Sequence, residues 1–115
     1  MASVEELKAK FQEIYSKAVD RLPEIRSWNK VYQIVLEDGG EFYVEISGGE
    51  LKVVDGRHPS PIATLTTTTE TLNNILEGKE DAMRAFMAKK LRITGNVLDT
   101  INLKKLIDAG LGKEI

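Results

Sequence analysis

The sequence has no cysteine and a single histidine among its 115 residues. Without thiols the chain can form no disulfide, no thiolate zinc site and no cysteine nucleophile. No apolar run approaches the ~20 residues that span a bilayer. Residues 1–10 carry charges of both signs instead of the apolar stretch of a secretory signal. These absences predict a soluble, cytoplasmic protein.

Neither sign of charge dominates the sequence. Sixteen basic and 18 acidic side chains give a net charge of -2, and they are spread along the chain without a basic stripe. We therefore expect no nucleic acid partner. A chain of this length predicts one domain, residues 1–115, which buries about two thirds of its unfolded surface.

The common catalytic signatures are also missing, including G-x-S-x-G, the P-loop, H-E-x-x-H and G-x-G-x-x-G. Asp55, His58 and Ser60 are close in sequence, but a Gly/Pro-rich turn explains them better than a catalytic triad does. The paired acids Glu5-Glu6 and Glu80-Asp81 stand at predicted helix starts, where the helix dipole favours them. The sequence predicts no enzyme, no catalytic residue, no metal and no cofactor.

The N-terminal segment has the pattern of an amphipathic helix. Ser3 and Glu6 form a capping box, and apolar residues then recur every three or four positions. The expected helix runs from about Val4 to Val19 and packs on its own domain. Pro23 ends this segment.

The middle of the chain changes to a period of two, which is typical of half-buried strands. Alternating apolar residues in 30–36 and 42–46 flank the turn Asp38-Gly39-Gly40, and a second Gly-Gly turn leads into 51–54. These segments predict an antiparallel meander with one apolar face. The β-branched segment Ile62–Thr67 predicts a fourth strand.

The last third of the chain alternates between helix and strand patterns. Thr68 or Thr69 caps a predicted helix that ends at Gly78, and Asp81 caps another over Ala82–Ala88. Alternation in 91–95 predicts a short strand that ends at Gly95, where φ > 0 is expected. Asn96 as N-cap and Asp99 at N3 predict a last helix from about Val97. The expected fold is α+β, with about five mainly antiparallel strands and helices packed on one face.

Part of this last third resembles a known family signature. Ala85-Phe86-Met87 and Lys90-Leu91-x-Ile93-x-Gly95-Asn96, with Pro61 to Thr66 upstream, closely resemble the sterol carrier protein type 2 domain in its stand-alone, single-domain form. Two positions depart from that pattern: Lys89 stands where the family often has Gly, and Leu98 where it often has a small residue. The resemblance implies a lipid-binding domain with an apolar cavity between helices and sheet.

Apolar stripes in the helical half are the candidate walls of that cavity. On periodicity alone they are ordinary core, but methionines suit a surface that repacks around varied ligands. Together with the resemblance they predict ten lipid-binding residues: Leu72, Ile75, Leu76, Met83, Phe86, Met87, Ile93, Val97, Leu98 and Ile101.

The expected function is non-enzymatic binding and transfer of a lipid, whether a fatty acyl chain, an acyl-CoA, a phospholipid or a sterol-like molecule. Transfer implies transient membrane contact and a gate. The candidate gate is the last helix with its tail, which Gly110 and Gly112 are expected to make mobile. The alternative is an accessory protein-interaction domain with a filled core and no lipid ligand, because Leu98 is large enough to occupy ligand space.

Overall fold

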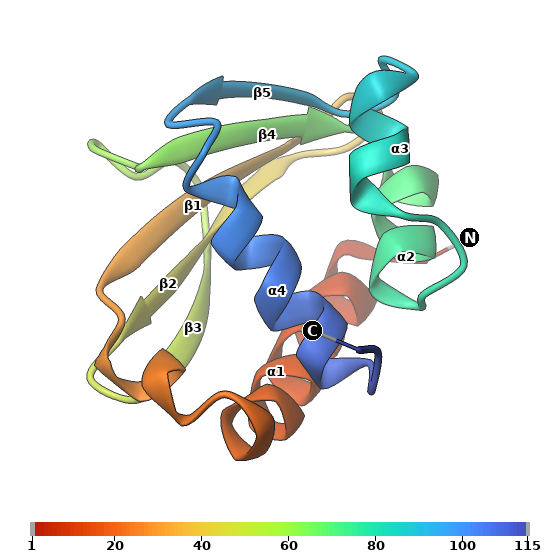
Figure 1. Ribbon diagram of the computed structural model, residues 1–115. Helices are drawn as coiled ribbons and strands as arrows, with labels where there is room; N and C mark the ends of the chain where they lie inside the picture. The colour runs from red at the N-terminus through yellow and green to blue at the C-terminus, as the bar shows by residue number, and fades with distance from the viewer. Residues whose placement is uncertain (1, 115) are drawn as a thin grey trace.

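The computed structural model describes residues 2–114 and contains a single five-stranded sheet with its helices (Figure 1). In chain order the elements are α1 (Val4–Arg21), the 3-10 helix η1 (Pro23–Ser27), β1 (Lys30–Leu36), β2 (Glu41–Ser47), β3 (Glu50–Asp55), β4 (Ala63–Thr67), α2 (Thr69–Leu76), α3 (Ala82–Met87), β5 (Arg92–Gly95) and α4 (Thr100–Gly110). Within the described residues, no helix combines the length and the hydropathy needed to cross a membrane.

The strand order is β3-β2-β1-β4-β5, and the sheet is mixed. β1 pairs with β4 in parallel, whereas β1 with β2, β2 with β3, and β4 with β5 are antiparallel. The predicted α+β class and mainly antiparallel sheet are confirmed. The parallel pair forms because the chain leaves the edge strand β3 and returns beside β1, on the side that β2 does not occupy.

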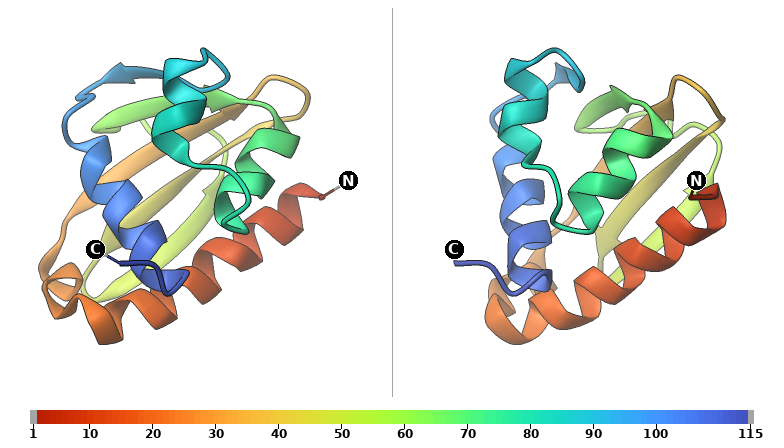
Figure 2. Two further views of the ribbon diagram at one scale, coloured as in Figure 1. Left: turned by 45° about the vertical axis from the view of Figure 1, so that its right-hand side comes forward. Right: turned by 90° about the vertical axis from the view of Figure 1, so that its right-hand side faces the viewer.

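The helices cover one face of this sheet (Figure 2). Ile34 on β1 lies opposite Phe42 on β2 and Leu65 on β4, and Leu65 in turn lies opposite Ile93 on β5. These residues occupy the same face because side chains alternate along a strand. No helix of residues 2–114 covers the other face, where Tyr43 contacts the ring of His58 at a centroid distance of 5.0 Å.

Most predicted helix starts are confirmed. The capping box of Ser3 and Glu6 is formed, Thr68 accepts the backbone N–H of Thr71, and Asp81 caps α3. α1 extends beyond the predicted Val19 to Arg21. It does so because the N–H of Leu22 still donates to Ala18 O at 2.8 Å, and only Pro23, which has no N–H, stops the helix.

The predicted start of the last helix was too early. Asn96 acts as the expected cap and accepts the backbone N–H of Asp99 at 3.0 Å, but residues 97–99 form tight turns and α4 begins at Thr100. The carboxylate of Asp99 does not reach back toward Asn96. Instead it accepts a hydrogen bond from Tyr32 on β1 at 2.6 Å.

Gly110 lies buried inside α4, which corrects its assignment to a mobile tail. A Cβ atom built on Gly110 would lie 2.4 Å from Ile14 O and 2.5 Å from Ile14 Cγ2 of α1. Gly110 therefore lets the two helix backbones approach closely where they cross. Gly112, with φ of 79°, ends the helix as a C-terminal glycine.

The close approach at Gly110 predicts that Gly110→Ala destabilises the fold. Helix propensity alone would make this change stabilising by about 1 kcal/mol. Overpacking against Ile14 should instead cost about 1 to 3 kcal/mol or more. Urea denaturation measures the difference, and Gly40→Ala is the control, because nothing lies within 4 Å of a Cβ there. A stabilised Gly110→Ala protein would contradict the crossing geometry.

Candidate apolar binding site

One cavity of about 140 Å³ lies between the helical layer and the β4–β5 end of the sheet. Its walls come from α1, α2, α3, α4, the 97–99 turn and the sheet. The lining residues are Phe11, Ile34, Leu65, Thr67, Leu72, Ile75, Ala82, Met83, Phe86, Leu91, Ile93, Val97, Leu98, Thr100, Ile101, Leu103, Lys104 and Ile107. Only Thr67, Thr100 and Lys104 among them are polar.

The cavity brings together eight of the ten residues predicted from sequence: Leu72, Ile75, Met83, Phe86, Ile93, Val97, Leu98 and Ile101. Leu76 and Met87 do not line it. Leu76 is buried elsewhere in the core, and Met87 is 73% exposed. Each belongs to the same apolar helical stripe as its neighbours, but Leu76 faces the closed core and Met87 faces solvent, so neither reaches the cavity.

Several lining residues were not singled out from the sequence, among them Phe11, Ile34, Leu65 and Leu103. Ile34 and Leu65 belong to the predicted apolar face of the sheet, and Phe11 to the apolar stripe of the first helix. The sequence signal for burial was therefore present at these positions. Nothing in it showed which part of each stripe lies opposite α3 and α4.

The cavity opens between α3 and the start of α4, and its mouth is apolar. Six large hydrophobic side chains are exposed among residues 2–114, either on α3 or between positions 97 and 101, and all except Met87 line the cavity: Met83, Phe86, Met87, Val97, Leu98 and Ile101. We call these six residues the apolar rim. Leu98 is 79% exposed, so it lies at the mouth and does not fill the interior.

The few polar groups of the cavity are already paired. Thr67 Oγ1 donates to Lys90 O at 2.8 Å, and Thr100 Oγ1 donates to Val97 O at 2.5 Å. Lys104 Nζ lies 2.6 Å from Asp108 Oδ2, and the hydrogen bond to Asp108 holds the pKa of Lys104 above its usual value. No lining polar group is left to demand a polar ligand, so the interior suits an apolar one.

Comparison with known proteins assigns the family. The profile of the SCP-2 sterol transfer family matches residues 8–108. The chain belongs to this family. Its fold matches a solved sterol carrier protein domain 2 of Helicoverpa armigera with a TM-score of 0.73 and 23% identity, over 99% of this chain and 96% of that one.

Two further proteins are similar to this chain. The sterol carrier protein 2 of Aedes aegypti, solved in complex with the C16 fatty acid palmitate, has a TM-score of 0.63 and 24% identity, over 87% of this chain and 96% of that one. Hydroxysteroid dehydrogenase-like protein 2 of Rattus norvegicus is 36% identical over 87 residues, which are 72% of this chain. That match spans only 16% of the rat protein's length.

The C-terminal end of α3 shows how this SCP-2 family chain accommodates Lys89 in place of Gly. Lys89 has φ of 64°, in the left-handed region that favours glycine. The N–H groups of Lys89 and Lys90 donate to the carbonyls of Phe86 and Ala85, which is the Schellman pattern. At the end of α3, Lys89 therefore adopts the conformation that glycine usually supplies there.

The N-terminal end of α4 is fixed to the sheet through Asp99. Its carboxylate accepts hydrogen bonds from Tyr32 Oη at 2.6 Å and Lys30 Nζ at 2.8 Å. Burial acts to raise the pKa of Asp99, but the bonds from Lys30 and Tyr32 outweigh it and hold the pKa below its usual value. Burial and the Asp99 contact raise the pKa of Tyr32. One wall of the cavity is thus anchored to β1.

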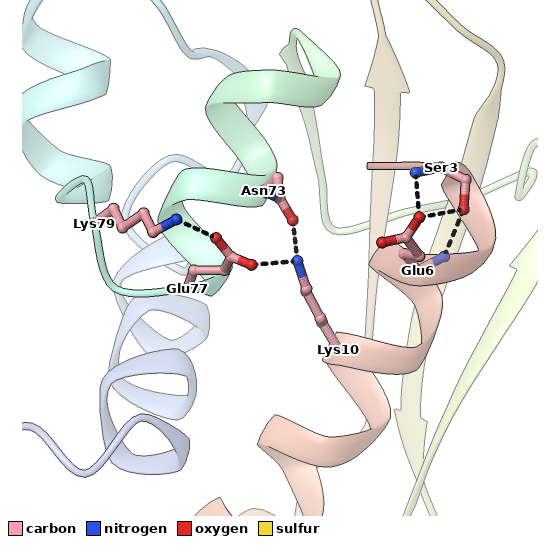
Figure 3. A network of polar contacts seen from close by, with 6 residues as sticks. All are labelled: Ser3, Glu6, Lys10, Asn73, Glu77 and Lys79. Carbon is pink, nitrogen blue, oxygen red and sulfur yellow. Dashed lines mark hydrogen bonds and ion pairs between the residues drawn. The ribbon is translucent and has the colours of Figure 1, made fainter. Parts of the chain in front are cut away.

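The cavity wall that α2 forms is held in place by a polar network between α1 and α2 (Figure 3). Lys10 of α1 reaches Asn73 and Glu77 of α2, with the Lys10 Nζ to Glu77 Oε2 distance at 2.8 Å, and Lys79 lies 3.0 Å from Glu77 Oε1. Lys10, and after it Lys79, lower the pKa of Glu77 to about 2. The network ties α2, with its lining residues Leu72 and Ile75, to α1.

The Asp99 anchor predicts a pH-dependent loss of stability in Asp99→Asn. Because the folded pKa is depressed, the carboxylate stabilises the fold above its unfolded pKa of about 4 and ceases to do so as pH falls through the lower folded pKa. We expect a loss of about 1 to 3 kcal/mol at pH 7 that shrinks toward pH 3. Denaturant unfolding over this range tests it. Asp20→Asn, at an exposed site, is the control, and a pH-independent loss would contradict the anchor.

Proposed function

We propose that the protein binds the acyl chain of a lipid in the cavity between α2, α3, α4 and the sheet. The observation that carries this proposal is an apolar cavity lined by five of the six exposed large hydrophobic side chains of residues 2–114. Contact between this apolar surface and water is unfavourable. An acyl chain that covers the surface stabilises the complex by about 25 cal/mol per Å² of apolar area buried. The palmitate complex of the Aedes aegypti relative supports the ligand class.

A bound acyl chain must widen the cavity. Its 140 Å³ is well below the roughly 300 to 1,000 Å³ of typical ligand pockets. The wall best able to move is α3, a six-residue helix in which only Ala85 is buried. Each methylene that enters contributes about 0.8 kcal/mol, so affinity should rise with chain length until the space is filled. Fatty acids, acyl-CoA and phospholipids all carry such a chain. They differ in the head group, and a phospholipid also has a second acyl chain.

The proposed role is non-enzymatic. His58 lies on the face of the sheet away from the helices, where it contacts Tyr43. Asp55 ends β3 opposite Phe42, and its carboxylate pairs with Lys8 of α1 on the helical face. The side chains of Asp55 and His58 therefore point to opposite faces of the sheet. His58 Nδ1 accepts the backbone N–H of Ser60 at 3.0 Å, so this nitrogen is already occupied. This arrangement supports a structured turn, as expected from the sequence.

The alternative of a filled-core interaction domain loses its main support. It relied on Leu98 to occupy the ligand space, and Leu98 is 79% exposed at the mouth. The exposed apolar rim alone would also suit a protein partner. The apolar cavity behind it is the observation that favours a lipid.

The proposal predicts that Phe86→Ala weakens fatty-acid binding at a small cost in stability. Phe86 is 37% exposed and lines the mouth, so the loss should stay below the roughly 3 to 5 kcal/mol of a close-packed Phe. Phe42→Ala is the matched control: Phe42 is 0% exposed, does not line the cavity, and should show the full loss. Displacement of a fluorescent fatty-acid analogue and a urea melt measure the two effects. Unchanged binding with a core-sized loss would place Phe86 in the ordinary core.

The position of Leu98 predicts a change in ligand preference. Leu98→Ala widens the mouth, so affinity should shift toward longer or bulkier acyl chains. The exposed site should lose less than about 1 kcal/mol of stability. A series of fatty acids of increasing length, titrated into wild type and variant, tests this. Leu111→Ala, a partly buried position away from the cavity, should not alter the preference. The filled-core alternative instead requires negligible binding by both proteins and a large stability loss in Leu98→Ala.

A further inference from the structure

The apolar rim is more exposed than a ligand cavity requires. Met87 does not line the cavity, yet it is 73% exposed, and Leu98 is 79% exposed. Monomeric proteins rarely leave large hydrophobic side chains clustered at the surface without a partner. We propose that the apolar rim is the docking surface for an anionic phospholipid bilayer, from which a lipid enters the cavity. This inference rests on the proposed function and identifies the partner that contacts the mouth of the cavity.

The charges around the rim fit an anionic surface. Residues 80–105 contain six basic and three acidic side chains, a net charge of +3 in a chain whose total is -2. Lys90, Arg92 and Lys104 have acidic partners. Arg84, Lys89 and Lys105 have no acidic side chain within 4.0 Å among residues 2–114. Each free basic residue near an anionic bilayer contributes about 1 kcal/mol.

These three cations come from the elements that carry the rim. Arg84 belongs to α3, Lys89 follows it in the turn to β5, and Lys105 lies one helical turn after Ile101 on the exposed side of α4. The right-hand view of Figure 2 shows α3 and α4 along the same side of the molecule. Exposed hydrophobic groups with basic residues beside them are the pattern of a membrane-surface helix.

The long helix α1 lacks this pattern. Its exposed positions hold four acidic and two basic side chains, and none of its large hydrophobic residues is exposed. A bilayer would therefore meet repulsion and no apolar contact there. A second copy of the chain is disfavoured as the occupant of the rim, because the pairing would place two positive surfaces against each other.

Vesicle co-sedimentation tests the charges. We expect wild type to bind vesicles of phosphatidylserine and phosphatidylcholine more tightly than vesicles of phosphatidylcholine alone, with binding weakened by salt. Arg84→Gln combined with Lys89→Gln should raise the lipid concentration for half-binding roughly 30-fold. The matched control is Lys17→Gln combined with Lys52→Gln, which removes the same charge from exposed positions on α1 and β3. This control should bind like wild type.

A site-specific label tests the apolar contact. The chain has no cysteine, so Leu98→Cys and Ser16→Cys each carry a single environment-sensitive fluorophore. The label at position 98 should shift to the blue with phosphatidylserine vesicles, and the label at position 16, exposed on α1, should not. Equal shifts at both positions would overturn the assignment of the surface.

The remaining outcomes separate this proposal from lipid binding in the cavity. Neither Arg84 nor Lys89 lines the cavity, so their double variant should bind a fluorescent fatty-acid analogue in vesicle-free buffer as wild type does. Wild type that binds the analogue but no vesicle overturns the docking surface and leaves the proposed function intact. A dimer that Leu98→Asp dissociates, measured by sedimentation velocity, would also overturn it, since the rim would then belong to a second copy.

Discussion

The close crossing of α1 and α4 at Gly110 sets the geometry of the helical layer. With no side chain at Gly110, the two helices meet almost backbone to backbone at Ile14. The other end of α4 is held on β1, where Tyr32 and Lys30 bind Asp99. α4 is thus fixed at both ends and runs from the sheet to α1 (Figure 1). The space it leaves near β4 and β5 has only short helices to cover it.

That space explains why the fold has a cavity at this position. A close-packed core leaves few voids, because each void forfeits dispersion contacts on its lining. Here α3 spans six residues and buries only Ala85, so it cannot complete the core. Its apolar side chains therefore stay partly exposed at the mouth. The same shortness is the reason why we assign the proposed widening of the cavity to α3 and not to the anchored α4.

Much of the fold follows from local physical chemistry. β2 and β4 alternate in burial as predicted, whereas Gln33 of β1 is buried on the face without helices, where it donates to the carbonyls of Phe42 and Gly56. Ser3, Thr68 and Asp81 cap their helices because a side-chain oxygen satisfies an otherwise unpaired N–H. Gly95 has φ of 91°, and a Cβ there would lie 2.9 Å from Ile62 O. The start of α4 was misjudged because Asp99 bonds to β1. That partner is distant in sequence, so spacing along the helix cannot predict it.

The sequence by itself determined the composition of the site: apolar residues at helical spacing, and a family signature that places them beside a cavity. Only the tertiary structure decided which of them face that cavity. It placed Leu76 in the core and Met87 at the surface, and it added Phe11 of α1 and Ile34 of β1 to the cavity lining. Periodicity fixes how residues on one element are oriented relative to each other. What lies opposite them depends on how distant elements cross, which Gly110 and Asp99 decide here.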